Sequence, residues 1–394
     1  MKRFILIVFI SVLFPLALFA DFGLVLSEGL LVEEIKEFDF ASKTTLAPWF
    51  SFPLGPMDFY ISVGLSANYE NGFVFIPELQ RLEFNLRTHP VFGFRLGRIP
   101  WQDPSLFTAK GFFDGIDAYA NLGPVHLGFA AFYTGLLFKN TGSINISPGD
   151  PTDYSLCLDW NDFQNTYFAP RRFFASLYGD FPFLPLGRGN INAGILAQFD
   201  LGDADEAFHT QYLLLRYTLG YKRFDLTACG AAELENTGKH GFRTAYAFSL
   251  ETGFQTGFFI DRLSLGLRWA SGEGTYTAAF FPVIREAQGF ALRPIFSGIM
   301  VFRANYQARF LPSFAAQLGG RYFLRTDSES FYDSGIKNDS YLLGAEVDGG
   351  IHWIPFSDLS ISLVGGMFFP QTGKAFGQDT PLRWSVTLRA IFSF

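Results

Sequence analysis

The chain ends with RWSVTLRAIFSF, residues Arg383 to Phe394, and this stretch decides the fold. Apolar side chains occupy every second position from Trp384 to Phe394, and mostly polar side chains lie between them. A two-residue period with unlike faces is typical of a β-strand. Because chain termini fray and an apolar terminus would be exposed to water, something apolar must cover the greasy face of this strand.

The opposite end of the chain predicts the compartment. Lys2 and Arg3 precede an apolar run from Phe4 to Phe19, and Ala20 precedes Asp21. This is the pattern of a secretory signal peptide with a small residue at its cleavage site. We therefore expect residues 1–20 to be a signal peptide that is removed after Ala20.

Composition excludes several classes of protein. Beyond the signal, no apolar run approaches the ~18 residues of a spanning helix, which excludes a helical membrane protein. The chain has 50 Phe, 40 Gly and only 17% charged residues, fewer than the quarter usual in soluble domains. Without Lys2 and Arg3 the formal net charge falls from −7 to −9, and an acidic balance argues against nucleic-acid partners.

The two cysteines predict no framework of disulfides and no metal site. Cys157 and Cys229 lie near neither a second Cys nor a His at the spacing of metal ligands. We expect both thiols to be free, with a single bridge between them as the alternative. The sequence predicts neither a metal nor another cofactor.

Alternating runs recur along the whole chain, and counting backward from Phe394 gives about eighteen of them. Sixteen is the alternative count, because the first two runs are weak. Most have ten to thirteen residues, near the ~9–11 of a tilted strand that crosses a bilayer and above the ~5–6 common in globular sheets. The runs are 22–32, 38–50, 57–69, 73–88, 91–98, 115–121, 124–134, 170–180, 190–200, 209–220, 224–234, 242–256, 261–271, 295–309, 313–325, 340–354, 358–369 and 382–394.

The connections between these runs alternate in kind. Short connections such as FLPS and IPFSD alternate with long polar ones such as the stretch from Gly135 to Pro170. A β-sandwich also has alternating strands, but short turns at one end and long loops at the other are typical of an outer-membrane barrel. We predict an all-β fold for residues 21–394: one closed antiparallel transmembrane β-barrel with both termini on the periplasmic side.

This prediction explains the last strand. Closure pairs it with the first strand, so that no strand edge is left unsatisfied in hydrocarbon. The alternating apolar residues then face lipid, and the strand resembles the signal that outer-membrane proteins present to the barrel-assembly machinery. The residues that carry this resemblance are Trp384, Val386, Leu388, Phe392 and Phe394.

The same alternation assigns more Arg than acidic residues to the lumen. Guanidinium groups in a pore attract anions and orient carboxylates through paired N–H donors. The alternative is that arginines and acids pair to brace the wall, because desolvated charges are normally paired. The pore-lining candidates are Arg95, Arg98, Asp114, Arg216, Arg243, Arg268, Arg303, Arg321, Arg325, Glu346, Asp348, Arg383 and Arg389.

Three stretches carry a further resemblance: FRLGRIPWQDPSLFTAKGFFDGIDAYANLG at 94–123, LGLRWASGEG at 265–274 and YLLGAEVDGGIHWIPFSDLSISLVGGMFFPQTG at 341–373. They are similar to outer-membrane channels of the alginate-export type and related porins. The resemblance implies an eighteen-stranded barrel that carries acidic polysaccharide or other small solutes through an Arg-lined lumen. We place Arg98 at the end of a strand and Asp114 in the next loop, either as an ion pair that pins the loop or in contact with solute.

The stretch from Asn140 to Pro170 contains four aspartates, at positions 150, 153, 159 and 162. Their spacing does not match the twelve-residue calcium loop. We expect a solvated external loop, with a loop that folds into the pore and narrows it as the alternative.

The predicted function is passive diffusion of small hydrophilic, in part anionic, solutes across the outer membrane of a Gram-negative-type envelope. The alternative is a closed barrel that serves as a surface adhesin or structural protein. No Ser lies in a nucleophile-elbow pattern and the five His are scattered, so we do not expect an enzyme. The expected partners are the lipid bilayer, the barrel-assembly machinery and small solutes.

Overall fold

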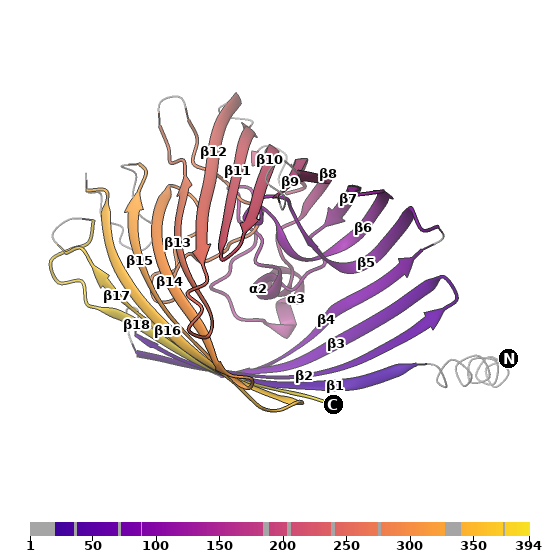
Figure 1. Ribbon diagram of the computed structural model, residues 1–394, viewed down its shortest axis with the longest axis horizontal. Coiled ribbons are helices and arrows are strands. Elements are labelled where there is room, and N and C mark those ends of the chain that lie inside the picture. The colour runs from indigo at the N-terminus through magenta and orange to yellow at the C-terminus, as the bar shows by residue number, and fades with distance from the viewer. Residues whose placement is uncertain are drawn as a thin grey trace.

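The computed structural model describes residues 20–394 except 35–37, 70–71, 88, 184–188, 203–205, 238–240, 275–276, 328–339 and 373–374. The predicted signal peptide, apart from Ala20, lies outside the described residues. The chain forms an 18-stranded antiparallel sheet in which each strand pairs with its neighbours in sequence. Strand β1 also pairs with β18, so the sheet closes into a barrel (Figure 1).

Eighteen strands confirm the predicted count and exclude the alternative of sixteen. The connection from β7 to β8 holds three short helices, α2 (Lys139–Gly142), η1 (Trp160–Asp162) and α3 (Phe163–Tyr167). Among the described residues, no helix has the length and apolar character needed to cross a bilayer. The strands are β1 (Asp21–Glu34), β2 (Phe38–Leu54), β3 (Met57–Tyr69), β4 (Phe73–Leu86), β5 (Phe92–Gln102), β6 (Lys110–Leu122), β7 (Val125–Tyr133), β8 (Arg172–Phe183), β9 (Gly189–Asp200), β10 (Phe208–Tyr221), β11 (Phe224–Thr237), β12 (Gly241–Phe254), β13 (Ile260–Ala270), β14 (Ile299–Leu311), β15 (Phe314–Arg325), β16 (Leu342–Phe356), β17 (Leu359–Pro370) and β18 (Arg383–Ser393).

The two ends of the barrel differ as predicted. Residues 55–56, 123–124, 222–223, 312–313 and 357–358 make two-residue turns, all of which follow even-numbered strands. The longest connections follow β7, β13 and β15. Strand β1 starts and β18 finishes at the end with the short turns, which becomes the periplasmic end of an outer-membrane barrel.

The last strand closes the barrel as the sequence predicts. The backbone N–H of Phe394 donates to the carbonyl of Leu24 at 2.9 Å, and the N–H of Leu24 donates back at 3.3 Å. Val386 and Leu388 are exposed on the outer surface, where the bilayer covers them. The final aromatic residue is therefore part of the wall, and its backbone polar groups are satisfied within the sheet.

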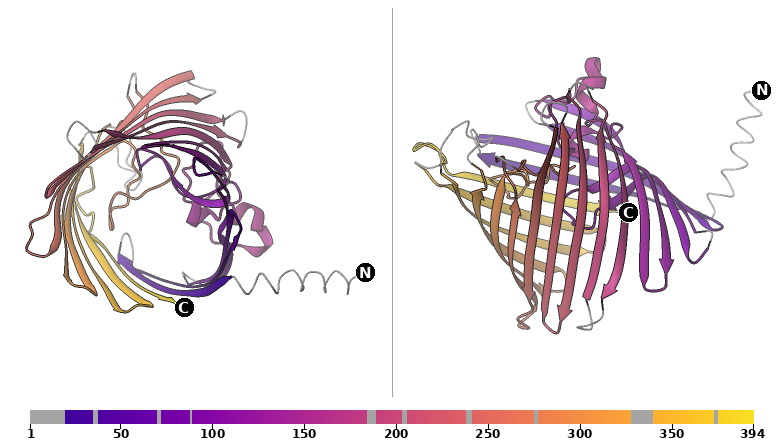
Figure 2. Two further views of the ribbon diagram at one scale, coloured as in Figure 1. Left: turned by 45° about the vertical axis from the view of Figure 1, so that its right-hand side comes forward. Right: turned by 90° about the horizontal axis from the view of Figure 1, so that it is seen from above.

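Three long connections fold into the lumen instead of projecting outward (Figure 2, left). They are the β5–β6 turn, the first part of the β7–β8 connection and the described residues of the β13–β14 loop, 271–274 and 277–298. Phe107 of the first packs on Phe296 of the third at a ring distance of 5.1 Å. Ile144 of the second forms an isolated bridge with Ile284 of the third. The buried apolar core therefore sits inside the barrel, where these connections meet.

The β5–β6 hairpin corrects a predicted boundary. The sequence predicts a loop between the runs 91–98 and 115–121, whereas β5 extends to Gln102 and β6 begins at Lys110. Arg98 and Asp114 are direct cross-strand partners. Asp114 therefore lies in a strand and not in a loop, because Pro100, Trp101, Phe112 and Phe113 pair across a hairpin that the turn-forming residues around Pro104 close.

Candidate functional site

The charged site of the lumen is a single row across five neighbouring strands. The register pairs Glu251 (β12) with Gly266, Gly266 with Arg303, Arg303 with Arg321, and Arg321 with Glu346 (β16). A Cβ on Gly266 would lie 2.6 Å from Nε of Arg303. The glycine thus leaves the space that the Arg303 side chain fills, and the row holds two arginines between two glutamates.

Every arginine in this row has a carboxylate partner. Arg303 Nη2 lies 2.5 Å from Oε2 of Glu251. Arg321 Nη1 lies 2.9 Å from Oε1 of Glu346 and 2.5 Å from Oδ2 of Asp348. The predicted bracing of the wall by paired charges is therefore present in the site itself.

In two of the inner-face clusters the arginine is more accessible than the acids that pair with it. The side chain of Arg321 is 20% exposed, whereas those of Glu346 and Asp348 are 0% and 2% exposed. Arg95 and its partner Asp117 show the same order, with 27% and 1% exposure. In these two clusters water in the lumen meets the guanidinium group more than its acidic partners, so Arg95 and Arg321 present N–H donors to a solute. Arg303 and Glu251 are similarly exposed, at 30% and 25%.

The β13–β14 loop forms the facing side of the site. The buried carboxylate of Glu346 accepts backbone N–H bonds from Phe290, Ala291 and Leu292, each at 2.9 Å. Arg321 lies over the ring of Phe290, with 5.1 Å from Cζ to the ring centroid. A hollow of about 350 Å³ remains between loop and wall, lined chiefly by Arg268, Glu286, Gln288, Phe290, Arg303 and Arg321.

The inner face on the other side of the barrel is packed with aromatic rings. Trp101 from β5 lies 5.4 Å from Phe132 of β7 and 5.7 Å from Phe174 of β8, measured between ring centroids. All three side chains are buried. These rings fill the lumen where they pack, whereas a hollow of about 540 Å³, lined in part by Arg95, His126 and Tyr178, remains elsewhere on the same side.

Buried polar clusters hold the inward connections in place. Asp103 accepts backbone N–H bonds from Ser105, Leu106, Thr108 and Ala109 in the β5–β6 turn, although burial raises the pKa of its carboxyl. These four bonds fix the turn that carries Phe107 into the lumen.

A second buried cluster ties the β7–β8 connection to the wall. Arg172 of β8 pairs with Asp150 of the connection and with Asp200 of β9, and all three side chains are 0% exposed. Of the four aspartates at positions 150, 153, 159 and 162, this one folds inward and the other three are exposed. The connection is thus partly the pore-narrowing loop that was the alternative and partly the expected external loop.

The register decides where each pore-lining candidate lies. Arg98 and Asp114 form an ion pair at 2.7 Å on the outward-facing positions of β5 and β6, where Arg98 also donates to the carbonyl of Leu136. They do not face the lumen, which corrects the prediction and supports the ion-pair alternative. Arg325 and Arg383 lie on the inner face but are buried. The remaining inner-face candidates are Arg95, Arg216, Arg243, Arg268, Arg303, Arg321, Glu346, Asp348 and Arg389.

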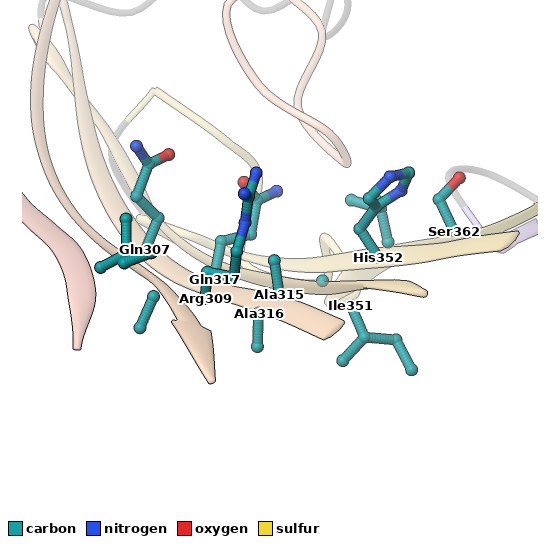
Figure 3. Close-up of a pocket in the computed structure, with 12 residues that line it drawn as sticks. Gln307, Arg309, Ala315, Ala316, Gln317, Ile351, His352 and Ser362 are labelled. Carbon is teal, nitrogen blue, oxygen red and sulfur yellow. The ribbon is translucent and has the colours of Figure 1, made fainter. Parts of the chain in front are cut away.

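A second inner row was missed as a unit by the sequence reasoning. It joins Arg309, His352, Arg389 and Lys43 through small residues at cross-strand positions between them. Figure 3 shows Arg309 and His352 pointing to one side of the wall while Ile351 points to the other. A hollow of about 400 Å³ lies here. The signal that could have found Lys43 is the alternation from Phe38 to Leu46.

None of Lys43, Arg309 and Arg389 makes an ion pair with another residue in the described part of the chain. The row therefore carries positive charge that the wall does not neutralise, in contrast to the paired row nearer the β13–β14 loop.

Neither a metal site nor a disulfide is found in the described part of the chain. No group of three or more His, Cys, Asp or Glu side chains is arranged to hold a metal ion there. Cys157 is exposed and Cys229 is buried, and both are free.

The sequence matches no protein-family model and no curated protein. Solved structures, however, share the architecture. The chain is similar to OccK11 (OpdR) of Pseudomonas aeruginosa, with a TM-score of 0.60, 12% identity, and 95% of this chain and 96% of that chain covered. OccK2 (OpdF) in complex with glucuronate gives 0.61 and 13%, covering 95% and 98%. OpdK with vanillate, also from P. aeruginosa, gives 0.60 and 11%, covering 95% and 98%. At these identities the similarity shows the fold, which is that of outer-membrane channels.

Proposed function

We propose that the protein is an outer-membrane channel through which small hydrophilic solutes diffuse passively, with a preference for solutes that carry a carboxylate. The observation that carries the proposal is the partly exposed N–H surface of Arg303 and Arg321 beside the 350 Å³ hollow, together with the burial of Glu346 and Asp348, the acidic partners of Arg321. A carboxylate accepts two parallel N–H bonds from a guanidinium group, so this surface fits such a solute. Glucuronate and vanillate, bound in two structures of similar fold, are both carboxylates.

The basic row of Arg309, His352, Arg389 and Lys43 would provide a second binding site along this path. Arg309, His352 and Arg389 lie toward the short-turn end of their strands, beyond the paired row. A carboxylate that leaves Arg303 and Arg321 would next meet positive charge instead of a bare wall. Two weak sites in sequence support conduction, because a solute must be able to leave each of them.

Planar-bilayer recording of the refolded barrel tests the proposal. We expect stepwise conductance and, in a KCl gradient, a reversal potential shifted toward that of the anion. Millimolar glucuronate should interrupt the current, and Arg303→Gln should lengthen the time between interruptions. A barrel that inserts yet never conducts would exclude the channel.

The packed lumen also favours a second candidate, a closed barrel that acts as an adhesin or structural protein. Three inward connections and the buried Arg172 cluster fill much of the interior. In that case, trimming the exposed part of the β7–β8 connection around Trp160 should abolish surface attachment without any change in membrane permeability.

Two further predictions belong to this proposal. Export would use the signal peptide at residues 1–20, and insertion would use the C-terminal strand as the signal for the barrel-assembly machinery. Phe394→Ala tests the second, because it should lower the yield of inserted barrel while refolding in detergent remains efficient.

A further inference from the structure

The barrel wall is interrupted between β4 and β5. These strands pair only from Leu82 to Leu86 against Phe94 to Arg98, although β4 begins at Phe73 and β5 continues to Gln102. On the other side of the hairpin, β6 pairs with β7 only from Asp114 onward. Beyond Arg98 and Asp114 the β5–β6 hairpin therefore has no neighbouring strand, and its tip leaves the wall for the lumen.

The tip of the hairpin lies against the inner face of β9 and against the β13–β14 loop. A Cβ on Gly194, on the inner face of β9, would lie 3.1 Å from Cγ of Pro104. Phe107 packs on Phe280 and Phe296 of the β13–β14 loop. What would have been the upper part of the wall thus becomes part of the constriction, and it leaves the edge of β4 without a strand beside it.

The edges of β4 and β5 that have no neighbouring strand need few backbone hydrogen-bond partners. Pro77 of β4 and Pro100 of β5 lack the N–H that a ladder would need. Side chains satisfy the carbonyls: Arg98 Nη1 donates to Leu79 O at 2.5 Å, and the Tyr167 hydroxyl donates to Pro77 O at 2.9 Å. A bilayer does not tolerate an unsatisfied sheet edge, and this edge avoids that cost without a ladder.

A non-strand element completes the wall at this place. We call residues 135–142 and 153–170, which contain α2, η1 and α3, the wall segment (Figure 1). Its Phe138, Leu158 and Tyr167 form a buried cluster with Ile76 of β4. Lys139 holds the two halves together by donating from Nζ to the carbonyls of Asp153 and Leu156.

The wall segment exposes apolar side chains beside the exposed Asp153, Asp159 and Asp162, and it has a direct connection to the lumen. Leu136, Leu156 and Trp160 are each about half exposed, which suits contact with lipid and with the membrane interface. Between its two halves, residues 143–150 enter the lumen, where the N–H of Asn145 donates to Val283 O at 2.8 Å. One stretch of chain therefore links the lipid-facing wall to the constriction.

We propose that the wall segment is a lateral gate between the lumen and the bilayer. Its polar ties to the hairpin and to β4 are three side-chain hydrogen bonds, Thr141 to Glu78, Tyr167 to Pro77 and Arg98 to Leu136. Elsewhere, adjacent strands are joined by continuous ladders of backbone bonds. Because a side-chain hydrogen bond contributes only about 1 kcal/mol net, the segment is the part of the wall that separates most readily.

The chemistry of the opening selects the solute. The segment and β4 meet mainly through the apolar cluster around Ile76. Lys43, on the inner face of β2 two strands from the opening, makes no ion pair in the described part of the chain. A single-chain amphiphile with a carboxylate head could hold its head in the lumen while its alkyl chain remains between segment and β4. This route crosses the wall and not the long axis of the barrel, so it goes beyond the diffusion path proposed above.

The test is photolabelling in liposomes with a dodecanoate that carries a diazirine at its carboxyl end. In a Cys157→Ser, Cys229→Ser background, Glu78→Cys and Thr141→Cys are bridged with a short bifunctional thiol reagent, which ties the wall segment to β4. The matched control carries the same reagent between Ala175→Cys and Ala197→Cys, a register pair in a regular ladder. Mass mapping reports whether the inner-face residues Thr45 and Ser66 are labelled.

We expect labelling of Thr45 and Ser66 in the control and its loss in the bridged protein, with recovery when a cleavable bridge is cut. Equal labelling of these residues in both proteins would overturn the proposal, because the amphiphile would then arrive through the mouths of the barrel. Labels confined to outward-facing residues in the control would overturn it as well. The labelling experiment does not depend on ion conduction. The lateral gate and the diffusion channel can therefore be disproved independently of each other.

Discussion

The inner faces of β5–β8 and β12–β16 obey the same alternation but use it differently. On the first side, the inward positions hold Trp101, Phe132 and Phe174, which pack against one another. On the second side they hold Glu251, Arg303 and Arg321, which pair with one another or with neighbouring acids. Alternation thus predicts which residues face lipid. The types of the residues at the other positions decide whether the inner face is packed with side chains or in contact with water.

The largest expected effect is on the free energy of unfolding, when the buried charge of Arg172 is removed. Arg172→Met leaves Asp150 and Asp200 without a cation in a fully buried place. Removing one partner of a buried pair costs about 3–5 kcal/mol, so urea unfolding in lipid should show a loss of about 4 kcal/mol. The control is Arg389→Met at the exposed row, which should change stability by less than about 0.5 kcal/mol.

Removing one ring from the aromatic cluster should lower the free energy of unfolding somewhat less. Phe174→Ala removes a buried ring and leaves a cavity, with an expected loss of about 3 kcal/mol. The matched variant Phe302→Ala is on the outer face, where lipid can fill the space, and it should cost clearly less in the same unfolding assay. Similar losses at both positions would show that the inner cluster is not tightly packed.

On the charged side, the anchor of the β13–β14 loop is the next most sensitive point. Glu346→Gln weakens the charge-assisted bonds to Phe290, Ala291, Leu292 and Arg321, which are worth about 1.5–3 kcal/mol. Limited proteolysis should cut the loop faster, and current recordings should become noisier. Glu273→Gln, at a more exposed glutamate of the same loop that pairs with Arg243, is the comparison and should speed cleavage less, because exposed pairs contribute less.

The smallest effect concerns selectivity. Arg303→Gln removes one charge beside the hollow, and one charge at about 4 Å in water is worth about 1 kcal/mol. The ratio of anion to cation permeability from reversal potentials should therefore fall about fivefold. Glu251→Gln removes the partner of Arg303 and should shift the ratio in the opposite direction; a shift in the same direction for both would contradict the proposed role of Arg303.

Strand count, closure and the positions of the termini could be predicted because each strand repeats the same two-residue period. Local departures from that period could not. In β4 the even positions Ile76 and Glu78 and the odd positions Arg81 and Glu83 all face inward, since the register shifts between Ser62 and Val63. Arg98 follows Gly97 with its positive φ, and its place under the wall segment depends on contacts with Leu136, 38 residues away.

Which connections fold inward was also beyond sequence reasoning. The pairing of Asp150 with Arg172 and the packing of Phe107 on Phe296 are contacts between distant segments. The residues that make them, Asp and Phe in polar loops, are equally compatible with an external loop. The acids that neutralise the lumenal arginines were visible, but their burial depends on the β13–β14 loop lying over them.

Cysteine accessibility tests the central claim most directly, namely that water reaches the charged rows of the lumen and not the packed aromatic cluster of β5 to β8. In the Cys157→Ser, Cys229→Ser background, Gln317→Cys and His352→Cys sample the first side, and Ala130→Cys, at a fully buried position of β7, samples the second. A charged methanethiosulfonate reagent should modify the first two quickly and lower the conductance, and leave Ala130→Cys unmodified in the folded barrel. Rapid modification at Ala130→Cys, or none at Gln317→Cys and His352→Cys, would contradict the account.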